Sequence, residues 1–347
     1  MPEEWPIAAM AADGSAPARA AGTGRLQAVR QDFFLDPGQR LTEQERALMT
    51  AMLRGLIRDV ASAIRAALPR GRLPANDDGD ASLIARLTSS KLVDEPHLMA
   101  LLLRRADEER IATAARARSA RREARVLQGF VSDNDGGVAA AAMAVILAKG
   151  RRRDRFGQYL ILFDDLAQTS AESLVHAIAA ALRAELAERE GLTGADLELT
   201  HASRQVLEHR DERRGINALI AALVDVLEAT GTLTDELVVA AANEGEVAFV
   251  AEILSRRGGL SGEASIDELL SADPKRLMTL LRISQSSRNL AAGLLGSIGD
   301  LLGVDDAGAA LAMFENMPDT EVQGVRAWLL TAPSYKAALE QLGPSRG

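Results

Sequence analysis

The sequence predicts an all-α protein built from more than ten short helices, and three observations support this prediction. The 47% hydrophobic content comes mainly from Ala, Leu, Val and Ile, with only 3% aromatic residues, which suits a helical core better than a β-sandwich. Apolar residues recur at helical spacing, and no segment alternates with period two over a useful length. Residues that cap or stop helices punctuate the chain at short intervals.

The N-terminal elements are a disordered tail and one firm helix. Residues 1–24 are rich in Ala, Gly and Pro and have no helical period, so we expect them to be disordered. Thr42 and Glu45 form a predicted capping box that opens the first helix, and Pro69 ends it. The apolar stripe of this helix consists of Leu48, Met52, Leu56, Val60 and Ala63/Ile64.

Short connections separate the remaining helices. Asp94 is the expected cap of a helix that has Pro96 in its first turn and continues to about residue 127, before a break at 131–137. A buried strand at 160–163 is an alternative, but the residues that follow extend this segment better as a helix. The other helices are expected at 81–90, 138–149, 155–167, 171–190, 195–209, 212–229, 235–242, 245–256, 274–283, 287–302, 306–316, 320–331 and 334–342. Their expected start signals include Thr234, Asn243 with Glu246, Ser265 with Glu268, and Asp273 before Pro274.

Many short helices with brief connections are typical of helical-pair repeats. The pattern predicts a HEAT-like right-handed array, which is an α-solenoid, or an irregular superhelix. The expected divisions are the tail at 1–24, an N-terminal helical region at 25–130 and a C-terminal helical array at 131–347. The stretches LVDEPHL at 92–98 and LTDELVV at 233–239 echo each other, although helix starts in general look alike and two copies do not establish a repeat.

Two stretches carry a resemblance to a known family. The segment that begins LTEQERALM at residue 41 and continues to residue 60 resembles the opening of a bacterial family of unknown function with HEAT-like helical pairs. The segment from GTLT at 231–234 to AFVAEIL at 248–254 is similar to a later unit of that family. The resemblance covers about residues 41–300. It implies an α-helical array, and it implies neither an established activity nor catalytic residues.

Composition excludes several classes of function. The absence of cysteine excludes disulfides, thiolate nucleophiles and Cys-ligated metals, and it fits a reducing compartment. The formal charge of −9 opposes wholesale nucleic-acid binding. The first residues carry acid where a signal peptide needs base, and the apolar runs at 138–148 and 290–302 are shorter than the ~20 residues that a bilayer requires. We therefore expect no membrane span and a cytoplasmic location.

The strongest local charge feature is an arginine-rich region. Residues 104–125 hold eight arginines against four acids, and a second basic cluster follows at 151–155. Such clusters bind acidic proteins or phosphates, but no aromatic residue lies between the arginines of the helix to stack on bases. The common alternative is a solvated helix surface. The candidate partner-binding residues are Arg104, Arg105, Arg110, Arg116, Arg118, Arg121, Arg122, Arg125, Arg151, Arg152, Arg153 and Arg155.

The other candidate motifs do not carry chemistry. His97, His176, His201 and His209 form no zinc pattern, and Glu172 with His176 is a common type of helix-surface pair. The acidic stretches at 76–80 and 133–137 lack the spacing of a calcium loop and are better explained as turns. We expect no metal, no cofactor and no catalytic residue. Gly293, Gly296 and Gly299 recur every three residues without a preceding strand, which favours close helix packing or a homo-oligomer contact over a dinucleotide loop.

The sequence therefore favours a non-enzymatic interaction, adaptor or regulatory protein. In this hypothesis a rigid helical surface presents the arginine-rich region to an acidic protein partner. Docking should weaken as salt rises, and replacing Arg118, Arg121 and Arg122 with Glu should abolish it. Nucleic-acid or nucleotide binding through residues 104–155 is the first alternative. An enzyme with a site that no motif marks is the second.

Overall fold

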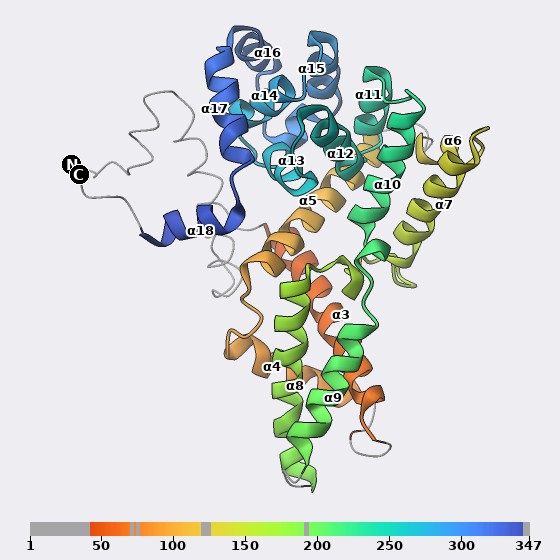
Figure 1. The fold of residues 1–347 in the computed structure, drawn as a ribbon, viewed down its shortest axis with the longest axis vertical. Coiled ribbons are helices and arrows are strands. Elements are labelled where there is room, and N and C mark those ends of the chain that lie inside the picture. Colours follow the sequence, from red (N-terminus) through yellow and green to blue (C-terminus); the bar gives the residue numbers. More distant parts are fainter. Residues whose placement is uncertain (1–41, 70–72, 74–76, 119–125, 191–193, 343–347) are drawn as a thin grey trace. The chain divides into compact units, whose positions relative to one another are not determined.

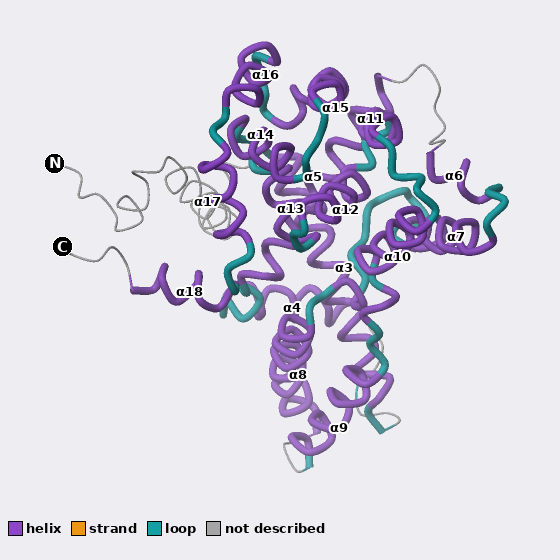
Figure 2. The backbone as a smooth tube through the Cα atoms, turned by 45° about the horizontal axis from the view of Figure 1, so that its top comes forward, coloured by secondary structure: helices purple, strands orange, loops and turns teal. Residues whose placement is uncertain are grey.

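The computed structural model describes residues 42–69, 73, 77–118, 126–190 and 194–342. Within these ranges the all-α prediction is confirmed. The described residues form sixteen α-helices and short 3₁₀ and π segments but no strand. Figures 1 and 2 show how loops join these helices. A single isolated bridge pairs Arg153 with Tyr159 among the described residues. The predicted tail at 1–24 lies outside the described residues.

The described chain divides into two compact units, each assembled from separated stretches of sequence. The α3/α8/α9 unit takes its described residues from 42–106 and 144–219, and the α11–α17 unit takes its own from 107–143 and 220–342. The expected division into 25–130 and 131–347 stays a prediction. The break at 131–137 is a tight capping turn, in which the Asp135 carboxylate accepts the backbone N–H groups of Gly137 and Val138 at 2.7 and 3.1 Å.

The α3/α8/α9 unit is built around one long helix. Helix α3 packs against α8 and α9, which also pack against each other, while α4 packs against α8. The predicted capping box is confirmed, because Thr42 and Glu45 each accept the other's backbone N–H at 3.2 Å. Besides parts of α5, α7 and α10, the unit holds α3 (Glu43–Ala67), α4 (Asp77–Ser89), η2 (Phe163–Asp165), α8 (Gln168–Glu190), α9 (Ala195–Glu208) and η3 (Glu212–Arg214).

The buried face of α3 is wider than the predicted stripe. Met52, Leu56, Val60 and Ile64 are buried as expected, and Met49, Leu53 and Ile57 are buried with them, whereas Ala63 is exposed. A helix that contacts two neighbours buries more than the narrow stripe that one neighbour would cover.

The α11–α17 unit is a succession of short helices. Neighbours α11 to α14 pack in consecutive pairs, α12 packs also on α14 and α14 on α16, and α15 returns to pack on α11. The regular solenoid stays a prediction. The helices are α5 (Pro96–Arg118) in part, α6 (Val126–Val131), α7 (Gly136–Arg151) and α10 (Ile216–Ala229) in part, α11 (Asp235–Asn243), α12 (Val247–Gly258), α13 (Gly262–Leu269), α14 (Pro274–Ile283), α15 (Arg288–Leu294), the π segment η4 (Leu295–Gly299), η5 (Asp300–Leu302), α16 (Ala307–Asn316), α17 (Asp319–Leu329) and α18 (Pro333–Leu342).

Some predicted helix starts are confirmed and others move by a few residues. Thr234 accepts from the backbone N–H of Leu237 at 3.2 Å, and Asp273 accepts from Lys275 at 2.9 Å. The cap of α5 is Glu95 rather than Asp94, because the Glu95 carboxylate accepts the backbone N–H groups at the start of the helix. The sequence alone does not distinguish between neighbouring polar residues as helix caps, because the path of the backbone decides which side chain reaches the free N–H groups.

The caps of α12 and α13 also differ from the prediction. Helix α12 begins at Val247, and the preceding Glu246 makes no side-chain cap bond. Helix α13 begins at Gly262, where Ser261 accepts from the backbone N–H of Ala264 at 3.1 Å, so Ser265 lies inside the helix.

The helix expected at 155–167 is wrong. The segment instead forms a tight turn followed by the single 3₁₀ turn η2. Asp154 explains the difference, because its carboxylate accepts the backbone N–H groups of Phe156 and Gln158 at 2.8 Å each. These two N–H groups therefore do not form the hydrogen bonds of a helix. Gly157 supports the turn with a φ of +79°.

Candidate functional site

The twelve candidate arginines fall into distinct environments, and two of them are internal. Arg105 is 2% exposed and donates to the Asn217 side chain at 2.7 Å, while Arg152 is fully buried and pairs with Asp165. Arg104 is half-buried. Arg105 and Arg152 therefore hold the α3/α8/α9 unit together and are not available to a partner.

Helix α5 uses more of its arginines within the α11–α17 unit. Arg110 donates to the Leu301 carbonyl at 3.2 Å and pairs with Asp107 at 3.3 Å. Arg116 pairs with Glu109 at 3.1 Å, two helical turns earlier. Both guanidinium groups have intramolecular acceptors, which reduces what they can offer to a partner.

The end of α5 behaves in the same way. Arg118 makes a two-pronged ion pair with Asp300, with one N···O distance of 2.9 Å, and the hydrogen bond from Arg118 lowers the pKa of that carboxyl. Arg121, Arg122 and Arg125 lie outside the described residues. Charge reversal at Arg118 would place a glutamate beside Asp300 and replace this exposed ion pair with two like charges.

The second basic cluster forms a compact turn, which we call the basic turn (residues 151–159). Asp154 organises it, because the Asp154 carboxylate accepts the backbone N–H groups of Phe156 and Gln158, and the Asp154 carbonyl accepts that of Gly157 at 3.0 Å. The backbone N–H of Asp154 closes the turn by donating to the Gln158 carbonyl at 3.0 Å. Together with a hydrogen bond from Arg153 Nη1 to the Gly157 carbonyl at 3.0 Å, these bonds hold the surface element in one conformation.

The basic turn presents three exposed arginines. Arg151, Arg153 and Arg155 are all exposed, and within the part of the chain that the structure describes no carboxylate pairs with Arg151 or Arg155. The guanidinium of Arg155 lies over the Phe156 ring, 4.7 Å from its centroid, and that of Arg153 lies 5.8 Å from the Tyr159 ring centroid. The turn thus combines cationic groups with an aromatic surface.

A buried ion pair anchors the base of the basic turn. The Asp165 carboxylate accepts from Arg152 Nε at 2.9 Å and from the backbone N–H groups of Leu162 and Ile216 at 3.0 and 2.9 Å. Burial by itself would raise the pKa of Asp165, but the hydrogen bond from Arg152 and the positive charges of Arg105 and Arg152 hold that pKa below its usual value. Asp165 is therefore an ionised carboxylate that positions the chain and is buried away from solvent.

Sequence reasoning missed Phe156, which is 74% exposed. The available signal was the pair Asp154 and Gly157, which marks a turn rather than a helix and would have placed the ring between basic residues at a turn tip. Reading the segment as a helix hid this arrangement.

Gly293, Gly296 and Gly299 do not form one helix-packing surface. A Cβ on Gly293 would lie 2.6 Å from Val239 Cγ2, so this glycine permits close packing of α15 on α11. A Cβ on Gly296 would meet no atom within 4 Å, and one on Gly299 would face Leu295 of its own segment. Only the first of the three glycines thus permits close helix packing, and it does so within the chain.

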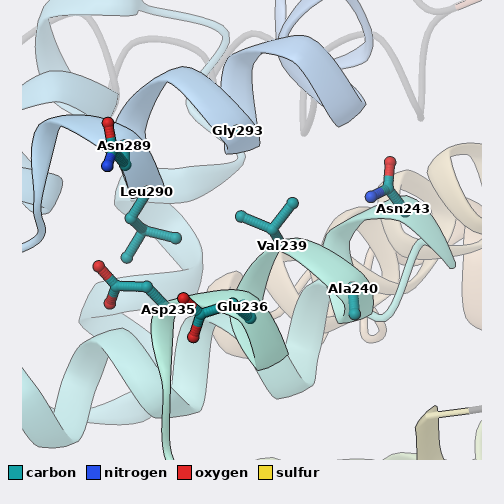
Figure 3. Close-up of a pocket in the computed structure, with 8 residues that line it drawn as sticks. All are labelled: Asp235, Glu236, Val239, Ala240, Asn243, Asn289, Leu290 and Gly293. Carbon is teal, nitrogen blue, oxygen red and sulfur yellow. The ribbon is translucent and has the colours of Figure 1, made fainter.

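A shallow groove of about 390 Å³ lies between α11 and α15 (Figure 3). Its lining includes the polar residues Glu236, Asn243 and Asn289 and the apolar residues Val239 and Leu290. Asp235 at one end is already bound by Arg257 and Ser287, at 2.6 Å each. The lining offers two carboxylates, two carboxamides and apolar side chains.

Other classes of site find little support. Among the described residues, no group of three or more His, Asp or Glu side chains is arranged to hold a metal ion. No helix in the described ranges is both long and apolar enough to cross a bilayer.

Comparisons with protein-family models, with curated proteins and with solved structures found no match. The resemblance to a bacterial family with HEAT-like helical pairs therefore stays a prediction.

Proposed function

We propose that the chain is a non-enzymatic interaction or adaptor protein that captures an acidic protein partner through the basic turn. The observation that supports this most directly is the exposure of Arg151, Arg153 and Arg155 within five residues of one rigid turn. Arginine at such a place binds carboxylates with two donors at once, and a fixed backbone lowers the entropy cost of binding.

Within the arginine-rich region, the basic turn is the part that we propose binds the partner. The described arginines at 110–118 have intramolecular acceptors, whereas no acceptor for Arg151 or Arg155 occurs among the described residues. Other exposed arginines include Arg54 on α3 and Arg204 on α9, and the adjacent Arg213 and Arg214, which pair with Asp211 and Asp164. In the basic turn, exposed arginines cluster beside an aromatic ring, and no described carboxylate pairs with Arg151 or Arg155.

The helical surface is the second part of the proposal. We propose that the short, capped helices of the α11–α17 unit form a HEAT-like array or irregular superhelix of a regulatory protein, and that it works in the cytoplasm. Consecutive packing of α11 to α14 supports an array, and the return of α15 to α11 favours the irregular form. The absence of cysteine is compatible with a reducing compartment.

The test is affinity capture with matched charge reversals. Tagged wild-type protein and the Arg151→Glu/Arg155→Glu variant are used at low salt, after nuclease treatment, on extract of the cells that express the chain naturally. We expect one or two stoichiometric acidic proteins to elute from the wild type as salt rises, and the variant to lose them. Each bound protein is then purified and tested directly against both forms.

The control is Arg54→Glu/Arg204→Glu, which changes the net charge by the same amount at exposed arginines on two helices of the same unit. The control should retain the partner. Equal loss in both variants would show that overall charge and not the basic turn governs capture, and equal retention would refute the role of the turn.

Nucleic-acid binding is the second candidate, because Phe156 supplies the exposed aromatic ring that the arginine helix lacks. A mobility shift with single-stranded oligonucleotide at low salt tests it. A shift that the Arg151→Glu/Arg155→Glu variant loses would favour nucleic acid over an acidic protein.

A further inference from the structure

Phe156 has no role in the fold that explains its position. Among the described large apolar side chains only Leu342, in the last helix, is more exposed than the 74% of Phe156. The hydrogen bonds described within the basic turn come from the Asp154 carboxylate, the Arg153 guanidinium and backbone groups, and a polar side chain at position 156 would allow all of them. The exposed ring therefore adds apolar surface to a site that is otherwise cationic.

The ring has two different faces in chemical terms. The Arg155 guanidinium covers one face at 4.7 Å from the centroid, which satisfies the attraction between the ring electrons and a cation. The face of an aromatic ring repels anions, so a carboxylate does not bind there. An aliphatic side chain suits the ring, while carboxylates suit the guanidinium groups of Arg151 and Arg155.

We propose that Phe156 is the apolar anchor of the basic turn, and that the turn recognises an acidic peptide segment with an aliphatic side chain flanked by carboxylates. This inference rests on the proposed function and gives the partner segment its chemistry. The carboxylates pair with Arg151 and Arg155, and the aliphatic side chain packs on the ring. Because the turn is already ordered, little conformational freedom is lost on binding.

Two fluorescent peptides test the inference by anisotropy at low salt. Both consist of Glu and Asp residues around one central position, which is Leu in one peptide and Ser in the other. For the full-length wild-type chain we expect the Leu peptide to bind about tenfold more tightly than the Ser peptide. In Phe156→Ala the two peptides should bind equally, and Arg151→Glu/Arg155→Glu should bind neither.

The outcomes separate the anchor from the proposed function. Arginine-dependent binding with no preference for Leu would overturn the anchor and leave the acidic partner standing. If the wild type binds neither peptide, both the anchor and the proposed function are overturned. The same holds if the Arg54→Glu/Arg204→Glu control and Arg151→Glu/Arg155→Glu bind the peptides equally. Tighter Phe156-dependent binding of a single-stranded thymidine oligonucleotide would replace the peptide with nucleic acid. An unchanged thermal unfolding midpoint of Phe156→Ala confirms that the ring is not needed for folding.

Discussion

Replacing Asp165 with Asn removes the only charge on the acidic side of a buried ion pair while keeping the shape of the side chain. Asp165 and Arg152 are 1% and 0% exposed, and Arg105 lies nearby with 2% exposure. An asparagine oxygen can still accept one backbone N–H, but the guanidinium of Arg152 loses its counter-ion in a site shielded from solvent. Breaking a buried pair in this way costs about 3–5 kcal/mol of unfolding free energy.

The unfolding free energy that Asp165 contributes should also depend on pH. Because the folded-state pKa of Asp165 is lowered, its stabilisation is fully present above the ordinary aspartate pKa of 3.8 and is lost as pH falls through the lower folded-state value. The stability difference between wild type and Asp165→Asn should thus be constant from neutral pH down to about 4 and shrink below that.

Urea unfolding followed by far-ultraviolet circular dichroism measures this difference. The control is Asp196→Asn, because Asp196 pairs with Arg183 on the surface and its loss should leave the midpoint unchanged. A neutral-pH midpoint of Asp165→Asn equal to that of wild type, or a difference that persists unchanged into acid, would refute the reasoning. Separate transitions for the two units would be fitted individually.

Close backbone contacts supply two further predictions. Gly245→Ala should destabilise the α11–α17 unit by at least about 2 kcal/mol, measured by urea unfolding, since the glycine has a φ of +73° and an added Cβ would lie 2.6 Å from Ala112 Cα. Gly293→Ala should cost about 1–3 kcal/mol in the same assay, because its Cβ would meet Val239 at 2.6 Å. The matched control Gly296→Ala meets nothing within 4 Å and should not destabilise the chain. Equal effects of Gly293→Ala and Gly296→Ala would contradict the packing role of Gly293.

Local signals were enough to predict the fold class and many helix limits. The capping box of Thr42 and Glu45 and the cap at Thr234 involve residues within a few positions of one another, and their chemistry is visible in the sequence. The error at 155–167 has the same local scale. There the Asp154 carboxylate accepts backbone N–H groups that a helix would use. These local hydrogen bonds favour a turn, although the spacing of the apolar residues alone favours a helix.

The candidate site was only partly predictable because the partners of arginines are distant in sequence. Arg105 meets Asn217 across 112 positions, and Arg118 meets Asp300 across 182. A count of charges in one segment cannot tell a guanidinium that pairs inside the fold from one that faces solvent. The local excess of arginine therefore did not identify which of the described arginines are accessible.

The exposed charges of the basic turn limit how much electrostatic attraction can contribute to the binding of an acidic partner. The chain has a net charge of −9, which repels an acidic partner at long range. At physiological salt this repulsion is screened beyond ~8 Å, so a docked segment experiences mainly the groups of the basic turn. Exposed ion pairs contribute only about 0–1 kcal/mol each, and three guanidinium groups beside the Asp154 carboxylate make a weak and unselective site by themselves. A specific partner therefore needs contact that salt does not screen, and within the turn the exposed ring of Phe156 is the group that can provide it.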